Sequence, residues 1–314
     1  MSLIREQDTT VSKWGEYLHE RDVKDALKRS LLILDKPDGP TSHQYVTWVK
    51  KLFGVKTGHS GTLDPNATGV LPVGLGYSVR VVDLLHVASK EYVAAMRFHS
   101  NVGYEDVKRV VEEYKGEVFQ MPPVRSSVKR ERRKREIYEL EILDHKDRDY
   151  LLRVRCESGT YIRTLCKDIG KSLGVGGNMT DLRRTKAGGF EEDESYHLQD
   201  VKDAYEMWKK GETEGFKDML IPYEEALRLY PKITVKDTAA GAVLEGAGLA
   251  VPGILEMDVF EAGDIVSIFS KKGEGLAVGE AVLDAQEIVE KDKGMAVDTS
   301  RVFHPSGKYP KKWK

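Results

Sequence analysis

The stretch GHSGTLDP, Gly58–Pro65, places one carboxylate, Asp64, between a glycine-rich turn and a proline. Gly58 and Gly61 can adopt positive φ and let other groups approach closely, whereas Pro65 disfavours helical geometry at the residue before it. The backbone therefore aims the carboxylate, which makes Asp64 a candidate nucleophile or general base. An Asp before Pro also commonly starts an ordinary turn, which is the more frequent use of such a segment. Other parts of the sequence have to decide between the two.

The composition predicts a globular protein with two domains. With 314 residues, 40% of them hydrophobic, the chain can bury a full core, and its length favours two domains over one. Cys156 and Cys166 have no CxxC pair and no histidine cluster nearby, which argues against a zinc site and a disulfide framework. The start MSLIREQDTT lacks the apolar core of a signal peptide, and no apolar run approaches the roughly 18 residues that span a membrane. We therefore expect a soluble, cytoplasmic protein.

The net charge of −2 conceals a segregation of charge along the chain. Residues 121–190 hold 17 Lys and Arg against 10 Asp and Glu, whereas residues 191–230 hold 5 against 12. The basic part concentrates positive charge where a polyanion such as RNA can use it. Within the acidic part, residues 191–225 predict a solvated helical linker, or alternatively a docking surface for a basic partner.

The densest basic run is RSSVKRERRKRE, residues 125–136, with seven basic side chains and two acidic ones. It follows the rigid sequence MPP, residues 121–123, and precedes two segments of period-two alternation at 137–143 and 150–157. We therefore expect this run to form a loop that projects from a sheet. By charge alone, a solvated surface loop and an RNA-binding loop are equally compatible with it.

The remaining periodicities predict an α+β fold with a mixed sheet. Strands are expected at 31–34 and 92–98, and helices at about 41–53 and 104–115. These elements interleave without the regular cadence of parallel βαβ units. Beyond Pro231 the chain consists of short strand-like segments separated by dense Gly and Pro, which predicts a second domain built as a small barrel of fewer than about 90 residues.

A further helix is predicted within ESGTYIRTLCKDIGKSL, residues 157–173, with Thr160 as its N-cap. Apolar residues recur at helical spacing from Ile162 onward, so Arg163 lies in the first turn and off the apolar stripe. An arginine there shares the positive end of the helix dipole, which favours a carboxylate or phosphate partner. A plain surface arginine is the alternative, and local evidence does not separate the two.

Six stretches, in order along almost the whole chain, carry a family resemblance: LLILDKPDGPTSHQ (31–44), GHSGTLDPNATGVLPVG (58–74), KEYVAAMRFH (90–99), MPPVRSSVKRERRKREIY (121–138), SGTYIRTLCKDIG (158–170) and LRRTKAGGF (182–190). They resemble the motifs of TruB-type pseudouridine synthases, and most closely those of the archaeal dyskerin homologues, the catalytic subunits of H/ACA guide-RNA particles. A single GxxDP match means little, whereas six in sequence make coincidence implausible.

The resemblance implies catalytic roles. Asp64 would be the family's invariant aspartate, which either attacks the sugar or abstracts a ribose proton so that uracil detaches from nitrogen and reattaches through carbon. Arg163 would pair with Asp64, Tyr92 would stack on the flipped uracil, and Leu182 would cap the other face of the ring. His59 resembles the histidine that helps to displace the target base. Without the resemblance, core packing for Tyr92 and Leu182 and a turn role for His59 are the simpler interpretations.

The resemblance also implies how RNA is held. The basic run resembles the mobile loop that closes over substrate RNA, and its candidate phosphate contacts are Arg125, Lys129, Arg130, Arg132 and Arg133. Lys36, in KPDGPTS (36–42), would have the structural role of supporting the loop that carries the aspartate.

The implied architecture is an N-terminal extension, residues 1–30, that packs on the last domain; a mixed-sheet pseudouridine synthase catalytic domain, residues 31–230; and a small β-barrel PUA domain, residues 231–314. The PUA domain would grip the lower stem and ACA end of a guide RNA, and its lysine-rich tail, 308–314, suits a phosphate backbone.

We therefore expect an isomerase that converts uridine to pseudouridine in rRNA, and by extension in tRNA, with no cofactor and no metal. The implied partners are an H/ACA guide RNA, the substrate RNA, and small zinc-ribbon, barrel and kink-turn-binding proteins, without a membrane. Two alternatives stay open: a stand-alone pseudouridine synthase acting on the tRNA T loop, and a non-catalytic RNA-binding scaffold.

Overall fold

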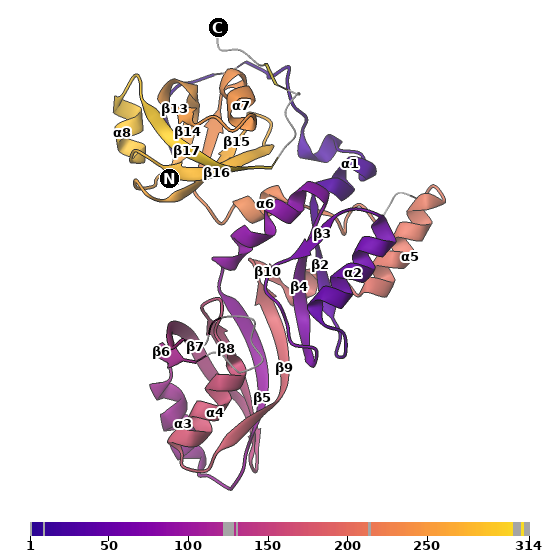
Figure 1. The fold of residues 1–314 in the computed structure, drawn as a ribbon, viewed down its shortest axis with the longest axis vertical. Coiled ribbons are helices and arrows are strands. Elements are labelled where there is room, and N and C mark those ends of the chain that lie inside the picture. Colours follow the sequence, from indigo (N-terminus) through magenta and orange to yellow (C-terminus); the bar gives the residue numbers. More distant parts are fainter. Residues whose placement is uncertain are drawn as a thin grey trace.

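The computed structural model describes residues 2–8, 10–121, 129, 131–212, 215–303 and 309–310. These residues form two β-sheets, each with its own helices and hydrophobic core (Figure 1). A ten-stranded sheet holds the segments with predicted catalytic residues, and a seven-stranded sheet is formed mainly by the chain beyond residue 231. The predicted α+β class with mixed sheets is confirmed.

The ten-stranded sheet has the order β11-β2-β4-β9-β5-β8-β7-β6, with β10 added to β9 and β3 added to β4. Its strands are β2 (Ser30–Lys36), β3 (Thr57–His59), β4 (Ala67–Leu75), β5 (Lys90–Phe98), β6 (Gly116–Gln120), β7 (Arg133–Lys146), β8 (Asp149–Cys156), β9 (Gly177–Ala187), β10 (Phe190–Glu191) and β11 (Ile221–Pro222). Strands β4 and β9 pair in parallel, and the neighbouring pairs β2–β4 and β9–β5 are antiparallel. Strand β9 thus brings residues of β4 and β5 together at the centre of the sheet.

Two groups of helices cover this sheet (Figure 1). The first group packs on β2 and β4 through one core and comprises α1 (Val23–Lys28), α2 (Ser42–Phe53) and α5 (Leu198–Lys209). The second packs on β5, β7 and β8 through another core and comprises α3 (Tyr104–Glu113) and α4 (Ile162–Ser172). Turns of 3-10 helix occur at Leu18–Glu20, Gly76–Arg80, Val82–His86, Glu192–Glu194 and Val251–Gly253.

Local signals account for the predicted helix at 41–53. The Thr41 side chain accepts a hydrogen bond from the backbone of Gln44, and the Gln44 side chain accepts one from the backbone of Thr41. This capping box satisfies two donors that the first turn would otherwise leave unpaired. Gly54, at φ 68°, ends the helix in the left-handed region that favours glycine.

The predicted N-cap at Thr160 is wrong. Helix α4 is preceded by Tyr161 as N-cap, while the Thr160 hydroxyl donates to the carbonyl of Glu157 at 2.8 Å. The Gln120 side chain instead anchors the backbone of the N-cap residue: its Oε1 accepts from the Tyr161 N–H at 2.8 Å and its Nε2 donates to the Tyr161 carbonyl at 3.2 Å. A residue 41 positions away therefore holds the start of α4, which local sequence does not reveal.

The acidic segment 191–225 is not a solvated linker. Helix α5 packs through Val201, Tyr205 and Trp208 into the core shared with α2, and β11 pairs with β2. Four-residue helix α6 (Glu224–Leu227) carries Glu224, which is only 2% exposed. The acidic side chains of α5 lie on its outer face while its apolar face is buried. The charge count alone therefore gave the wrong prediction of a solvated linker.

The seven-stranded sheet has the order β1-β14-β12-β15-β16-β17-β13. Its strands are β1 (Ser2–Ile4), β12 (Lys232–Val235), β13 (Leu249–Ala250), β14 (Ile254–Asp258), β15 (Ile265–Phe269), β16 (Gly275–Ala281) and β17 (Met295–Val302). Helices α7 (Asp237–Leu244) and α8 (Ala285–Glu290), which the strand-rich expectation omitted, close its core. No helix in the described ranges is long and apolar enough to cross a membrane.

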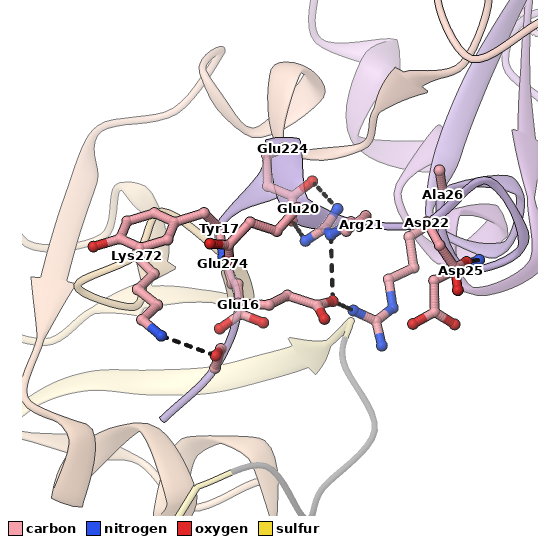
Figure 2. Close-up of polar contacts among 12 residues, drawn as sticks. Glu16, Tyr17, Glu20, Arg21, Asp22, Asp25, Ala26, Glu224, Lys272 and Glu274 are labelled. Atoms are coloured by element: carbon pink, nitrogen blue, oxygen red, sulfur yellow. Dashed lines mark hydrogen bonds and ion pairs between the residues drawn. The ribbon is translucent and has the colours of Figure 1, made fainter. Parts of the chain in front are cut away.

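The N-terminal segment joins the two sheets. Strand β1 pairs antiparallel with β14, and α1 then packs in the core beneath β2 and β4. Between them, the Arg21 guanidinium donates to both carboxylate oxygens of Glu224 at 3.0 and 2.6 Å, as Figure 2 shows. Lys272, from the turn between β15 and β16, donates to the carbonyl of Gly15 at 3.1 Å.

An apolar cluster completes the contact between the sheets. It combines β2 and β4 residues with Tyr223 and Leu227 of the α6 region, and with Phe269, Val278 and Phe303 of the second sheet. The Tyr223 hydroxyl donates to the carbonyl of Gly275 at 2.5 Å. The seven-stranded domain is therefore held against the ten-stranded sheet by packing and by hydrogen bonds that join Gly275 to Tyr223 and Glu224.

Candidate active site

The centre of the candidate site is an ion pair between Asp64 and Arg163. Asp64 lies in the turn between β3 and β4, residues 60–66, hereafter the Asp64 loop, and Arg163 lies in the first turn of α4. Arg163 Nη2 donates to Asp64 Oδ2 across 99 positions of sequence. Both side chains are about half exposed, at 54% for Asp64 and 43% for Arg163, so a ligand can reach the carboxylate.

Lys36 fixes the C-terminal end of the Asp64 loop. Its side chain is fully buried, and Nζ donates to the carbonyls of Pro37 at 2.8 Å, Pro65 at 2.8 Å and Ala67 at 2.7 Å. Burial lowers the pKa of Lys36, but three carbonyl acceptors stabilise the ammonium form. The lysine thus clamps Pro65 and Ala67, one and three residues after Asp64.

Ser42 fixes the residue before the aspartate. Its hydroxyl accepts from the N–H of Leu63 at 2.9 Å and donates to the carbonyl of Leu63 at 3.1 Å. Both side chains are buried, so these bonds are shielded from water. A further backbone bond from Ala67 N–H to the Asp64 carbonyl, at 3.0 Å, closes the turn. The Asp64 carboxylate is therefore exposed on a backbone that is held on both sides.

Tyr92 and Leu182 lie on the strands beside this loop. Tyr92, on β5, faces Arg184 of β9, and Leu182, on β9, faces both Ala94 of β5 and Ala67 of β4. Both side chains are partly buried, and burial raises the pKa of Tyr92. Leu182 sits one strand from the end of the Asp64 loop, because Ala67 follows that loop directly, and Tyr92 sits two strands from it.

His59 ends β3 at the start of the Asp64 loop. Its side chain is partly buried, and burial lowers its pKa, so the ring is neutral at pH 7. The charge on Arg184 acts in the same direction. In the described part of the chain the buried Nδ1 of His59 has no hydrogen-bond partner.

The basic loop is described only in part. Arg125 and Arg130 lie outside the described residues. Lys129 pairs with Glu131, Arg132 lies 4.9 Å from the ring centre of Phe119, and Arg133 opens β7 opposite Gln120. These three residues lie at the end of the β6–β7 pair, and Gln120 of that pair holds the start of α4, where Arg163 is found.

Sequence reasoning missed two residues of the site. Gln120 holds Tyr161 at the start of α4, and Arg184 binds the Asp64 loop from β9. Arg184 stood in the motif LRRTKAGGF, where period-two alternation places neighbouring arginines on opposite faces of a strand. The sequence did not indicate which of the two faces the interior. Arg183 lies outside and pairs with Asp35 at 2.9 Å.

The described residues contain no cluster of His, Cys, Asp or Glu that could hold a metal ion. Burial raises the pKa of the Cys156 and Cys166 thiols to about 12, so both cysteines are apolar core residues at neutral pH. The chemistry available in the site is therefore that of an exposed carboxylate with an arginine partner, an aromatic ring and a neutral imidazole.

Family models match the chain along most of its length. The "DKCLD (NUC011) domain" matches residues 1–46, and the "TruB family pseudouridylate synthase (N terminal domain)" matches residues 50–162. The "tRNA pseudouridylate synthase B C-terminal domain" follows at residues 163–228, and the "PUA domain" at residues 231–303.

Relatives match over nearly the full length. The protein named "Probable tRNA pseudouridine synthase B" of Methanopyrus kandleri is 46% identical over 97% of this chain and 91% of its own length. Its namesake in Methanocaldococcus jannaschii is 44% identical over 99% of this chain and 94% of its own length.

Two solved structures have the same fold. A chain in a crystal structure of a Cbf5-Nop10-Gar1 complex matches with a TM-score of 0.94 at 44% identity, over 99% of this chain and 96% of that one. A chain in a structure of an H/ACA RNP bound to a substrate RNA containing 2'-deoxyuridine matches with a TM-score of 0.92 at 41% identity, over 100% and 97%. The chain therefore belongs to the TruB family of pseudouridine synthases, and its second sheet is a PUA domain.

Proposed function

We propose that this chain converts uridine to pseudouridine in RNA as the catalytic subunit of a guide-RNA-directed H/ACA particle. The observation that carries the proposal is the full-length match, at a TM-score of 0.92, to a chain of an H/ACA RNP bound to a substrate RNA. This match includes the N-terminal segment and both domains. A match of the catalytic domain alone would support the enzymatic activity but not the membership of an H/ACA particle. The exposed Asp64 carboxylate on a clamped loop supports the enzymatic part.

In this proposal Asp64 and Arg163 act together. The bond between the ribose and a uracil nitrogen breaks, and a bond from the ribose to a uracil carbon forms. The carbon loses its proton and the nitrogen gains one, so the net reaction is an isomerisation that consumes no co-reactant. Asp64 provides the ionised carboxylate for the sugar, either as nucleophile or as base, and the guanidinium of Arg163 orients it.

The remaining site residues hold the substrate. Tyr92 stacks on the extruded uracil, Leu182 covers its other face, and His59 takes the place that the base leaves. Phosphate contacts come from the basic loop, in which the described Lys129 and Arg132 have exposed side chains. Such contacts hold RNA without reading its sequence, so base pairing to a guide supplies the target choice.

The roles of the domains, the location of the chain and its partners belong to the same proposal. The extension 1–30, the catalytic domain 31–230 and the PUA domain 231–314 are the functional units, and the chain works in the cytoplasm. The expected partners are a guide RNA, its substrate RNA, and the small zinc-ribbon, barrel and kink-turn-binding proteins of the particle. The complex of Cbf5 with Nop10 and Gar1 supports two of these protein partners by analogy.

A stand-alone tRNA activity is a second candidate, because the curated relatives are named "Probable tRNA pseudouridine synthase B". The two functions share one site and differ in what presents the RNA. A non-catalytic scaffold is disfavoured, since Asp64 and Arg163 are paired, exposed and unobstructed among the described residues.

The deciding experiment measures the conversion of labelled uridine in ribosomal RNA and in a tRNA T-loop substrate, with and without a matching guide RNA and the partner proteins. We expect conversion of the ribosomal uridine only when guide and partners are present. Equal conversion of that uridine without a guide would refute the particle assignment. Conversion of the tRNA substrate alone would favour the second candidate.

A further inference from the structure

Arg184 is the largest fully buried side chain in the described part of the chain, with 1% of its surface exposed. Its Nε donates to the carbonyl of Val70 on β4 at 2.8 Å, and its Nη2 donates to the carbonyl of Gly61 in the Asp64 loop at 2.9 Å. Tyr92 faces Arg184 across the β5–β9 pair, and its hydroxyl interacts electrostatically with the guanidinium. One side chain thus contacts three elements of the site.

The backbone around Arg184 is shaped to admit it. A Cβ on Gly61, which has φ 71°, would lie 3.1 Å from Arg184 Nη1. A Cβ on Gly69, which has φ 103°, would lie 2.2 Å from the carbonyl oxygen of Arg184. Two glycines in left-handed conformations therefore let the Asp64 loop and β4 approach this arginine.

A packing role does not explain a guanidinium in this place. Among the described residues no carboxylate pairs with Arg184, whereas its neighbour Arg183 pairs with Asp35 and Glu192. A buried charge without an ionic partner is costly, and an apolar side chain of similar volume would fill the space at lower cost. Burial accordingly lowers the pKa of Arg184. What the arginine offers in return is a rigid fork of several donors.

The other supports of the Asp64 loop do not reach Tyr92. Lys36 joins the loop to the end of β2, and Ser42 joins it to the start of α2. In the described structure Arg184 is the side chain that links the loop, through Gly61, to the tyrosine on β5. The gap between Asp64 and Tyr92 is where the proposed function places the uridine, so its width depends on this link.

Resting on that proposed function, we propose that Arg184 is a positioning residue for the isomerisation, which holds the Asp64 loop and the Tyr92 hydroxyl at a fixed separation. It does not touch the substrate. Lysine keeps the charge but has no fork, so Arg184→Lys cannot hold Gly61, Val70 and Tyr92 in the same geometry. A displacement of about 1 Å in a catalytic constellation can lower the rate by about 100-fold.

The test uses Arg184→Lys and the matched control Arg183→Lys, which alters the adjacent residue on the outer face of β9. Single-turnover uridine conversion is measured at saturating RNA, with the wild type and Asp64→Asn fixing full activity and background. RNA affinity and thermal unfolding are measured on every variant. In parallel, 3-fluorotyrosine at position 92 reports the Tyr92 hydroxyl by ¹⁹F NMR, with 3-fluorotyrosine at the buried Tyr150 as the control probe.

We expect the folded Arg184→Lys protein to bind RNA as the wild type does, to convert uridine about 100-fold more slowly, and to shift the ¹⁹F resonance at position 92 only. Arg183→Lys should keep the wild-type rate. A wild-type rate in Arg184→Lys, an unchanged resonance at position 92, or an equal loss of rate in Arg183→Lys would overturn the proposal.

Two outcomes need a second measurement. If Arg184→Lys does not fold, Tyr92→Phe removes the same contact from the other side; a lower rate at unchanged RNA affinity supports the link, and a wild-type rate overturns it. If the wild type converts no uridine, the proposed function fails by itself. The resonance at position 92 then still decides whether Arg184 holds Tyr92.

Discussion

The ion pair between Arg21 and Glu224 gives a prediction whose size follows from burial. The pair is bidentate, with donor–acceptor distances of 3.0 and 2.6 Å, and the two side chains are 2% and 3% exposed. It lies where the N-terminal segment, α6 and the PUA domain meet (Figure 2). The substitution Arg21→Met removes the guanidinium and leaves the Glu224 carboxylate buried.

The expected loss is about 3–5 kcal/mol in the free energy of unfolding, the usual cost of removing one partner from a buried pair. After the substitution, Glu224 keeps the N–H of Gly275 as a donor, at 3.3 Å. That single long bond cannot replace two charge-assisted ones. Because whole domains are stable by only about 5–15 kcal/mol, the loss should be visible in any unfolding experiment.

Urea unfolding followed by far-UV circular dichroism measures this loss. The midpoint for Arg21→Met should fall well below that of the wild type without a change in slope. The matched control is Arg97→Met, because Arg97 makes an equally bidentate pair with Asp149, at 2.6 Å for each bond, whose side chains are 56% and 47% exposed. Water screens that pair, so its loss should not move the midpoint measurably.

A second variant separates the pair from the volume of its side chains. Arg21→Met combined with Glu224→Leu removes both charges and should recover most of the lost stability, because no uncompensated charge stays buried. Equal midpoints for Arg21→Met and Arg97→Met would refute the reasoning, since burial would then make no difference. A double variant no more stable than Arg21→Met would contradict the assigned cause.

Three further predictions concern the catalytic sheet. Ser42→Ala leaves the buried N–H and carbonyl of Leu63 unpaired and should lower the free energy of unfolding by about 1–3 kcal/mol, with slower uridine conversion; a wild-type midpoint and rate would contradict the clamp. Gly69→Ala should yield no folded protein, since its Cβ would lie 2.2 Å from a backbone oxygen, whereas Gly54→Ala, with φ 68° and open space, should cost only about 1–2 kcal/mol in chemical denaturation. Burial, with the charge of Arg184, lowers the pKa of Lys90 to about 8, so between pH 8 and 10.5 the unfolded state binds more protons than the folded state. As the pH rises through this range, the free energy of unfolding of the wild type should therefore increase relative to that of Lys90→Met, and parallel plots of the two free energies against pH would refute this.

The sequence predicted those elements whose signals are local. The capping box at Thr41 and Gln44 and the glycine after Phe53 lie within one helix, so the bounds of α2 were nearly those observed. The awkward helix position of Arg163 indicated an acidic or phosphate partner, and Asp64 is in contact with it. The strands β12 and β15 carry short apolar runs bounded by turn residues, and both lie beyond Pro231, where short strands were expected.

Features that depend on tertiary contacts could not be read from the chain. Gln120 anchors the backbone at the start of α4, and Arg21 of the N-terminal segment pairs with a glutamate 203 positions away. The acidic composition of α5 did not indicate that its apolar face packs in the core. The alternation in β9 did not indicate that Arg184 faces inward. In each case a local pattern was compatible with two environments, and packing chose one.

The central claim is that the Asp64 carboxylate performs the isomerisation of uridine, and Asp64→Asn tests it most directly. This change keeps the size of the side chain and removes its negative charge, while the loop stays clamped by Lys36 and Ser42. Conversion of labelled uridine in a guide-paired RNA should be abolished, with RNA affinity nearly that of the wild type. Conversion at the wild-type rate by Asp64→Asn would contradict the account.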